Sequence, residues 1–555
     1  MKTEYDVVVV GSGGAGLSTA LVSAQKGLSV LVVEKTQYFG GTTAISGGGI
    51  WVPGNHLALD AGLKDSPEDG FSYIEGLVED RLRADILRTY VDNAHEMVRY
   101  MHDNTDVRFS LHPDQPDYYL DLPGAKTDGR VLDPVDFDGR QAPEDLVAIR
   151  PPLKEFNAPM GFMVGFPDIP HLMDAKKSIK SLFHVLKMVG RYVKDRISYP
   201  RGTHLTMGNA LIARLMYSAQ KAGVELQNNT AMTDLLTEDG KVVGVELEHN
   251  GVKTKVATKK AVVLASGGFS QNEEMRKKFI PYPESHVSFL PEGNTGDGIA
   301  AAEKVGGGLE EGNYHNAAWA VLSVLKEPNG NVRKQPHVML DRTKPGCIAV
   351  NDKGERFVNE CAANFVEAMH DTASVPAHLV CDHKFIKKYG LGLVMPGGMG
   401  LGKMIKAGYV ITAPTVEGLA EKIGADKNGL LETVKKHNVY AEQGKDPDFG
   451  KGDTEADTCW GDLEHSPNPC LGPIATGPYY AVKIFPGDGS TTLGLKVSDS
   501  AEVLDAEGNP VGGLYACGLD MNVLWRGREP SHGSYNGLSL TFGYVIANHL
   551  AESGN

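Results

Sequence analysis

The sequence is poor in cysteine, in long apolar runs and in positive charge. Its six cysteines, at 347, 361, 381, 459, 470 and 517, show no C-x-x-C spacing, so zinc, covalent haem and a disulfide framework lack support. No run of about 18 apolar residues is present, and we expect no integral membrane segment. A net charge of −15 argues against nucleic acid and anionic surfaces as partners. A small molecule in the cytoplasm is the expected setting, and no metal site is expected.

The length and composition indicate a soluble protein of more than one domain. The chain has 555 residues, of which 41% are hydrophobic and 23% charged. At roughly 100–200 residues per domain, two or three domains are expected. Such a chain can bury a sizeable core.

The N-terminal segment predicts a strand, a helix and a second strand around a glycine-rich turn. "YDVVVV" (5–10) leads into Gly11, Gly13, Gly14, Ala15 and Gly16 in G-x-G-x-x-G spacing, and "LSVLVVEK" (28–35) ends near Glu34 and Lys35. In such a unit, backbone N–H groups approach a pyrophosphate and the acid accepts from ribose hydroxyls. The sequence therefore predicts a dinucleotide site here.

Three later segments repeat the glycine-rich pattern. "YFGGTTAISGGGIWVPGN" (38–55) is longer than ordinary α/β connections and suits a loop around a larger cofactor. The stretch 223–269 alternates like strands before it ends in Gly267 and Gly268, and "GNPVGGLYACGLD" (508–520) is a further strand followed by glycine. The cofactor-binding candidates from these segments are Gly41, Thr42, Thr43, Ser46, Gly47, Gly48, Ala231, Met232, Ser266, Gly267, Gly268 and Gly518, and Asn272 follows three residues after the second segment.

These segments together resemble a known family over nearly the whole chain. "VVVGSGGAGLSTAL", "VVEKTQYFGGTTAISGGGIWVP", "VVLASGGFSQNEEMRKKF", "ERFVNE", "GLYACG" and "GSYNGLSLTFG" look like the fumarate reductase/succinate dehydrogenase flavoprotein superfamily, and more closely like its 3-ketosteroid dehydrogenase branch. The resemblance implies FAD as the cofactor and an α/β fold, in which a Rossmann-like FAD-binding domain is interrupted by a smaller α+β cap domain. It also adds Ser534, Gly537, Leu538 and Ser539, in the last helix, to the cofactor-binding candidates.

The same resemblance implies a domain division. Residues 1–285 would form the first part of the FAD-binding domain, with a helical insertion at about 125–200; 286–472 would form the catalytic cap, and 473–555 the second part. No histidine lies within "TTAISGGGIWVP", so we expect non-covalent FAD, although His56 follows closely. The insertion contains a basic amphipathic segment, "MDAKKSIKSLFHVLKMVGRYVKDRI" (173–197), which reads either as a solvated helix packed on the domain or as a surface for membranes or lipophilic substrates.

The substrate motifs depart from those of the family. Dicarboxylate enzymes of the superfamily carry a "HHTMGG" run and an arginine near the final helix, whereas this chain has "FPGDGSTTLGL" (485–495) and "SHGSYNGLSL" (531–540), with Arg526 and Arg528 displaced upstream. A fumarate or succinate role is therefore disfavoured. Steroid enzymes carry a Tyr-Pro-Gly-x-Gly run, where this chain has Glu529 to Gly533.

The resemblance assigns roles to four catalytic candidates. Gly533 would offer its N–H to a ketone oxygen, and Tyr118 stands in the matching P-D-Y context. The cap position of the family's tyrosine base is Cys361. Tyr535 or Ser534 could supply a replacement hydroxyl, or Glu529 could be the base if desolvation raises its pKa. Glu529 could instead pair with Arg526 or Arg528.

We therefore expect an FAD-dependent dehydrogenase that introduces a C=C bond beside a ring ketone, of the 3-ketosteroid Δ1 or Δ4 type. The expected chemistry is α-proton abstraction with hydride transfer to flavin N5. Three alternatives stay open, namely a desaturase of a smaller cyclohexanone-type ketone, a fumarate-reductase-like enone or enoate reductase, and a flavin-binding protein without turnover. Because no haem or iron–sulfur motif is present, the electron acceptor would be a quinone, an electron-transfer protein or oxygen.

Overall fold

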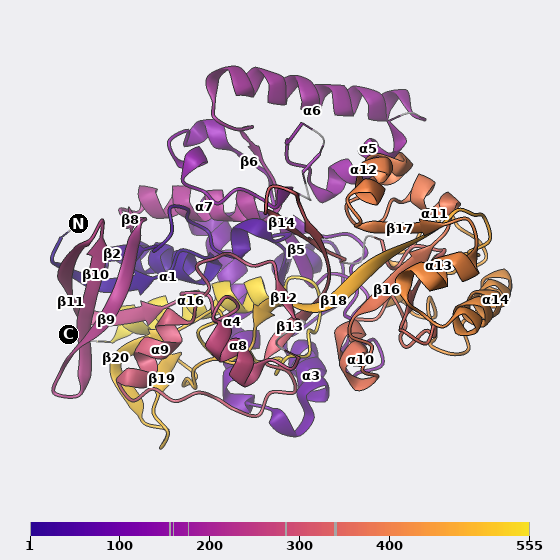
Figure 1. Ribbon diagram of the computed structural model, residues 1–555. Coiled ribbons are helices and arrows are strands. Elements are labelled where there is room, and N and C mark those ends of the chain that lie inside the picture. Colours follow the sequence, from indigo (N-terminus) through magenta and orange to yellow (C-terminus); the bar gives the residue numbers. More distant parts are fainter. Residues whose placement is uncertain are drawn as a thin grey trace.

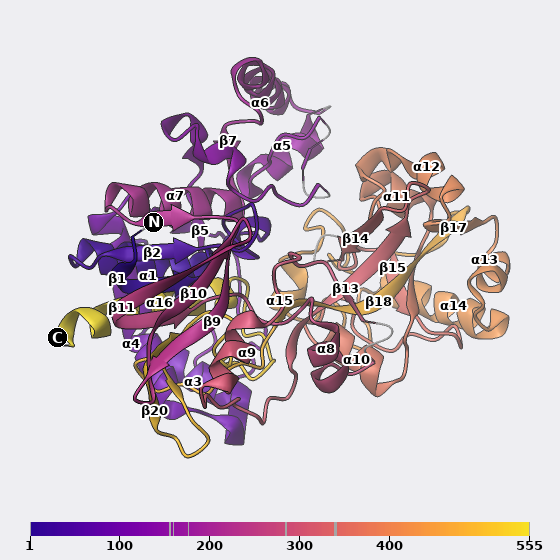
Figure 2. The same cartoon turned by 60° about the vertical axis from the view of Figure 1, so that its left-hand side comes forward.

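The computed structural model describes residues 2–154, 157–158, 160–175, 177–282, 286–337 and 341–553. Figures 1 and 2 show two lobes, each built on its own sheet, with both ends of the chain in the same lobe. No helix in these ranges is long and apolar enough to cross a membrane.

The first lobe is built on an eight-stranded sheet. Its strand order is β19-β20-β11-β1-β2-β8, with β10 added to β11 and β9 to β10. The five central strands, from β20 to β8, run parallel, while β10 and β19 pair antiparallel. The strands are β1 (Glu4–Val10), β2 (Val30–Val33), β8 (Glu225–Gln227), β9 (Thr230–Glu238), β10 (Lys241–His249), β11 (Val252–Leu264), β19 (Glu502–Leu504) and β20 (Pro510–Ala516).

The predicted strand–helix–strand unit is confirmed. The β-branched run of β1 is buried on both faces, as a central parallel strand requires, and α1 (Gly14–Gln25) follows it directly. Helix α1 packs against α7 (Met207–Lys221) and α16 (Ser534–Glu552). The other helices of this lobe are α2 (His56–Asp60), α3 (Pro67–Val78), α4 (Ala84–Asn104), α8 (Glu273–Phe279) and α9 (Asp297–Lys304).

The second lobe is built on a seven-stranded sheet around the long strand β18. Its strands are β12 (Val287–Ser288), β13 (Ala317–Lys326), β14 (Val332–Pro336), β15 (Cys347–Val350), β16 (Ala377–Cys381), β17 (Val410–Ala413) and β18 (Tyr479–Thr491). Its helices are α10 (Phe365–Asp371), α11 (His383–Lys388), α12 (Leu401–Lys406), α13 (Val416–Ile423), α14 (Lys427–Gln443) and α15 (Glu455–Thr458). Because β18 follows residue 472, this sheet reaches into the stretch predicted as the second part of the FAD-binding domain. The domain division stays a prediction.

The insertion at 125–200 is helical only in its second half. It begins with β5 (Val131–Pro134) and β6 (Phe137–Asp138), which pair with β3 (Ile50–Trp51), β4 (Phe109–Leu111) and β7 (His204–Leu205). Prolines at 134, 143, 151 and 152 disfavour helix there. Helices α5 (Ile169–Asp174) and α6 (Ile179–Ser198) follow, and both views place α6 at the outer edge of the molecule.

Candidate active site

The turn between β1 and α1 is closed on one side and open on the other. Gly11 has a φ of 109°, and a Cβ there would lie 2.1 Å from the carbonyl oxygen of Ala265. At Gly13, by contrast, a Cβ would meet nothing within 4 Å. The turn is therefore pressed against the sheet at Gly11 and leaves space beside Gly13, which suits the close approach of a pyrophosphate to backbone N–H groups.

Glu34 is held at the end of β2 by two donors. The Ser12 hydroxyl donates to one carboxylate oxygen at 2.7 Å, and the Thr36 N–H donates to the other at 2.9 Å. A carboxylate fixed here retains acceptor capacity for ribose hydroxyls.

One cavity brings most of the predicted cofactor-binding residues together. Those that line it are Gly11, Gly13, Gly14, Ala15, Glu34, Lys35, Gly41, Thr42, Thr43, Ser46, Gly47, Gly48, Met232, Ser266, Gly267, Gly518 and Ser539. Three of the four catalytic candidates, Glu529, Gly533 and Tyr535, line the same cavity. Residues that meet here come from both lobes, because Trp319 of β13 and Ser490 of β18 also contribute.

The remaining cofactor-binding candidates lie outside the lining of this cavity. A Cβ on Gly16, Gly268 or Gly537 would lie within 2.1–2.5 Å of a neighbouring atom, so these glycines permit close packing. Asn272 caps α8 by accepting from the Met275 N–H at 3.0 Å. Leu538 is fully buried in α16, Ala231 belongs to β9, and Ser534 begins α16.

Several lining residues were not singled out by the sequence. They include Arg150, Asn294, Asp297, Trp319, Ser490 and Asn536. They come from loops, strands and helices far apart in the chain. Of these residues, Ser490 lies within the quoted segment "FPGDGSTTLGL" and Asn536 within "GSYNGLSLTFG".

Helix α16 begins at the cavity, as the sequence predicted. Gly533, which precedes it, has a φ of 82°, and a Cβ there would lie 2.6 Å from the carbonyl carbon of Gly49. Glycine is therefore needed for both the backbone conformation and the space. The first N–H groups of a helix lack intrahelical partners, so the positive end of α16 faces the cavity.

Tyr118 reaches this region although it does not line the cavity. Its N–H donates to the Pro530 carbonyl at 2.9 Å, and the Ser531 hydroxyl donates to the Pro116 carbonyl at 3.2 Å. The neighbouring Asp117, which is 1% exposed, accepts from Trp51 Nε1 at 2.8 Å and from Arg130 at 2.7 Å. This buried network fixes the 116–118 loop against residues 530–531.

Glu529 is a carboxyl group with a strongly perturbed pKa. Burial raises its pKa from 4.5 to about 7. The alternative that it pairs with Arg526 or Arg528 is wrong, because Arg526 binds Glu310 and Arg528 approaches Glu79 at 3.9 Å. A carboxyl group that exchanges its proton near neutral pH is suited to general acid–base catalysis.

Several buried polar atoms at the cavity have no hydrogen-bond partner within the described ranges. On residues that line the cavity they are Trp319 Nε1 and His532 Nε2, together with Ser490 Oγ and Tyr535 Oη, which neighbour each other. Leaving such atoms unsatisfied is costly, and a bound polar ligand would supply their partners. Together with the open turn at Gly13 and the held carboxylate of Glu34, these atoms fit FAD and a polar substrate.

Two histidines near the cavity have different environments. Burial lowers the pKa of His532 to about 4, and its ring lies 6.0 Å from that of His112 and 6.1 Å from that of Phe166. His56 is the histidine nearest in sequence to the glycine-rich segment 38–55. It begins α2, and its ring centroid lies 5.2 Å from that of His102. His56 is not among the residues that line the cavity.

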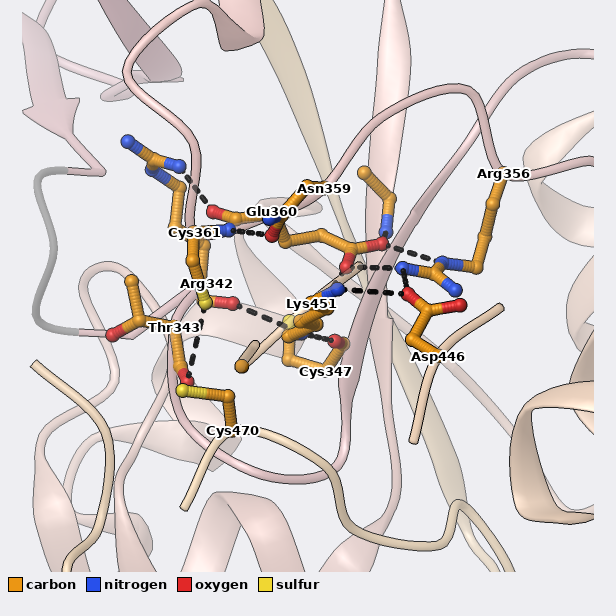
Figure 3. Close-up of polar contacts among 12 residues, drawn as sticks. Arg342, Thr343, Cys347, Arg356, Asn359, Glu360, Cys361, Asp446, Lys451 and Cys470 are labelled. Carbon is orange, nitrogen blue, oxygen red and sulfur yellow. Dashed lines mark hydrogen bonds and ion pairs between the residues drawn. The ribbon is translucent and has the colours of Figure 1, made fainter. Parts of the chain in front are cut away.

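Cys361 is fixed by a buried charge network in the second lobe (Figure 3). Glu360 accepts from Arg356 at 2.8 and 2.9 Å, and its carboxylate lies 3.2 Å from Lys451 Nζ. Arg356 also binds Asp446 at 2.9 Å. Cys361 follows this network, is 2% exposed, and has a pKa raised well above its usual value by burial. It is a buried thiol rather than a base. All six cysteines are free, and no cluster in the described ranges is arranged to hold a metal.

Comparisons with known proteins agree with this architecture. The model of the FAD binding domain family matches residues 6–535. The chain is 38% identical to 4-oxocyclohex-2-ene-1-carboxylate 5-dehydrogenase of Sinomonas cyclohexanicum, over 99% of this chain and 94% of that protein. It is 35% identical to 3-oxosteroid 1-dehydrogenase of Mycolicibacterium smegmatis, over 99% and 98%.

A solved structure is similar over the whole chain. It is the 3-ketosteroid delta1-dehydrogenase of Sterolibacterium denitrificans in complex with 1,4-androstadiene-3,17-dione, with a TM-score of 0.92 and 35% identity, covering 99% of this chain and 100% of that one. The chain therefore belongs to the FAD-binding flavoprotein oxidoreductases, in the branch of the 3-ketosteroid dehydrogenases.

Proposed function

We propose that this protein dehydrogenates a ring ketone at the carbon–carbon bond next to the carbonyl. The proposal rests on one observation. Glu529 and Gly533, which precedes α16 at its positive end, line the same cavity as the proposed FAD-binding residues. A base and an oxyanion site are the two groups that α-proton removal requires from a protein.

Glu529 is the proposed base. Its pKa of about 7 leaves a substantial ionised fraction at neutral pH, whereas burial raises the pKa of Tyr118 and Tyr535 well above the usual value. Groups whose pKa values are pushed apart take opposite roles. We therefore propose that the tyrosine hydroxyls donate hydrogen bonds and that Glu529 accepts the α-proton.

The oxyanion site is proposed to combine the Gly533 N–H with the Tyr535 hydroxyl. Both residues line the cavity, and the buried Tyr535 hydroxyl has the Ser490 hydroxyl as its neighbour there. Donors that already point at the developing charge lower the barrier without reorganisation. When bound, FAD supplies the hydride acceptor, its N5 atom.

We further propose that FAD is held without a covalent bond. The support is the position of His56, whose ring packs on His102 rather than on the cavity. Acid precipitation should therefore leave the visible flavin absorbance in the supernatant. Flavin that stays in the protein pellet would contradict this prediction, and a His56→Ala variant would then show whether His56 is the attachment point.

Two substrate classes are candidates. The steroid class is supported by the likeness to a structure solved with 1,4-androstadiene-3,17-dione. A single ring that carries both a ketone and a carboxylate is supported by the likeness to the Sinomonas relative, 4-oxocyclohex-2-ene-1-carboxylate 5-dehydrogenase.

Anaerobic mixing with a panel of ring ketones should separate the classes. The panel is 3-ketosteroids with and without the 4-ene, 4-oxocyclohexanecarboxylate, its uncharged methyl ester, and succinate. We expect a ring ketone to bleach the flavin absorbance and succinate to leave it unchanged. Bleaching by the oxo acid but not by its ester would assign the carboxylated class, and bleaching by steroids alone would assign the steroid class. No bleaching by any ketone would overturn the proposed function.

A further inference from the structure

Helix α6 is held to the rest of the protein by one face only. Asp195, which is 4% exposed, accepts from the Thr203 N–H at 3.0 Å and from the Thr203 hydroxyl at 2.6 Å. His184 meets Asp168 at 2.7 Å. A small apolar cluster, made of Ala158, Phe162 and Val164, packs under Met188, Val189 and Tyr192. The contacts of α6 with the rest of the protein therefore come from this inner face, which also borders a second cavity lined by His184, Met188 and Tyr192.

The outer face of α6 carries a stripe of large apolar side chains in contact with solvent. They are Ile179, Leu182, Phe183, Leu186, Val193 and Ile197, which are 44–81% exposed. At 3.6 residues per turn, these positions and Gly190 fall within an arc of about 100°. Scattered exposed hydrophobic residues need no explanation, but a continuous stripe along one helix marks an interaction surface.

Cations flank this stripe. Lys180, Lys187 and Lys194 recur every seven residues along one edge, Arg196 lies on the other, and all four are exposed. The one acidic residue of α6 is Asp195, which is turned inward. Although the whole chain has a net charge of −15, the outer face of α6 is purely cationic and apolar. The expectation from net charge therefore does not hold for this face.

We propose that the outer face of α6 docks the protein on a membrane surface that contains anionic lipids. In this geometry the apolar stripe enters the headgroup boundary and the lysines meet lipid phosphates, as in other interfacial amphipathic helices. A second copy of the chain is disfavoured as the occupant, because a two-fold contact would bring the same cationic edges together. The proposal is independent of the reaction assigned above.

The segment that leads into α5 and α6 also contacts the cavity described above. The segment before α5 places Phe166 against His112, with ring centroids 5.0 Å apart, and against His532. Phe166 also approaches Gly47, a residue of the cavity lining. Docking through α6 would therefore anchor the segment that carries Phe166, which packs at the cavity.

Co-sedimentation of the full-length holoenzyme with vesicles tests the proposal. We expect the protein to pellet with vesicles of equal parts phosphatidylcholine and phosphatidylglycerol, and much less with phosphatidylcholine alone. The triple variant Lys180→Gln, Lys187→Gln, Lys194→Gln should weaken binding to the mixed vesicles roughly a hundredfold, since each lysine near an anionic surface contributes about a tenfold or smaller factor. Phe183→Ser with Ile197→Ser should weaken binding to both kinds of vesicle.

The matched control is Val252→Ser with Val332→Ser, which removes two equally exposed apolar side chains elsewhere in the first and second lobes. It should leave vesicle binding unchanged, and all variants should keep wild-type flavin content. Wild-type protein that stays in the supernatant, or binding that survives both α6 variants, would overturn the proposal. Concentration-dependent dimers in sedimentation velocity that the α6 variants abolish would also overturn it, in favour of a second copy of the chain.

Discussion

Glu529→Gln should lower kcat by about a hundredfold to ten-thousandfold, the usual contribution of a general base. Glutamine keeps the size and polarity of the side chain but cannot take up a proton. In the wild type, kcat/KM should rise with pH through about 7, because the pKa of Glu529 is raised to about 7 and only its ionised form accepts the α-proton. That rise should be absent from the residual activity of the variant.

The pH profile separates a base from a donor. If Glu529 instead donated a hydrogen bond to the ketone from its protonated form, activity would fall above about pH 7 and the glutamine variant would retain most of it. Glu79→Gln is the matched control, because Glu79 is a largely exposed carboxylate that approaches Arg528, the neighbour of Glu529. Unchanged flavin content and unfolding temperature would show that the variant is folded.

The residues that we propose to hold the cofactor are recognisable in the sequence because each part of their pattern is local. A β-branched strand, a glycine turn and a helix start are contiguous in sequence, so Gly11, Gly13 and Glu34 are recognisable from their spacing. Glycines such as Gly16 and Gly537 belong to the same patterns but serve packing against neighbouring backbone. Sequence spacing cannot distinguish a glycine that admits a ligand from one that admits another part of the chain.

The reaction end could not be predicted to the same depth because distant segments assemble it. Trp319 and Ser490 line the same cavity as Glu529, and the Tyr118 N–H donates to the carbonyl of the next residue, Pro530. Proximity in sequence suggested Arg526 as the partner of Glu529. Arg526, however, has a φ of 53° in a turn, and its guanidinium donates to the Arg81 carbonyl and pairs with the Glu310 carboxylate. A local backbone turn decided the environment of the base.

The amphipathic pattern of 173–197 correctly predicted the helix over Ile179–Ser198, but not that a separate helix, α5, ends at Asp174, nor which face of α6 would be covered. Its inner face is covered by Phe162 and by the hydrogen bonds of Asp195, both set by the preceding and following loops. Both views place α6 at the outer edge of the molecule, and the apolar residues of its outer face are 44–81% exposed. Periodicity indicates that a helix has an apolar and a polar face, but which face is covered depends on the tertiary structure.

Glu360→Gln should lower the free energy of unfolding by about 3–5 kcal/mol, the usual cost of removing one partner from a buried ion pair. Glu360 and Lys451 are fully buried, and Arg356 is nearly so, with Asp446 as the other acid of the network. Loss of the Glu360 charge leaves two buried cations facing one carboxylate. Urea unfolding followed by tryptophan fluorescence measures the difference, with exposed Glu355→Gln as the control on the same loop.

The pH dependence of this loss has a definite sign. The neighbouring cations hold the pKa of Glu360 well below its ordinary value of 4.5. The stabilisation is therefore fully present above about pH 4.5 and is lost as the pH falls toward the folded-state pKa, so the gap between variant and wild type should be widest at neutral pH. Adding Lys451→Met to Glu360→Gln removes the second unbalanced charge and should recover much of the loss. Two results would contradict this prediction: a free energy of unfolding of Glu360→Gln within about 1 kcal/mol of wild type, or a double variant less stable than Glu360→Gln alone. Either would mean that charge interactions in the network do not stabilise the loop that carries Cys361.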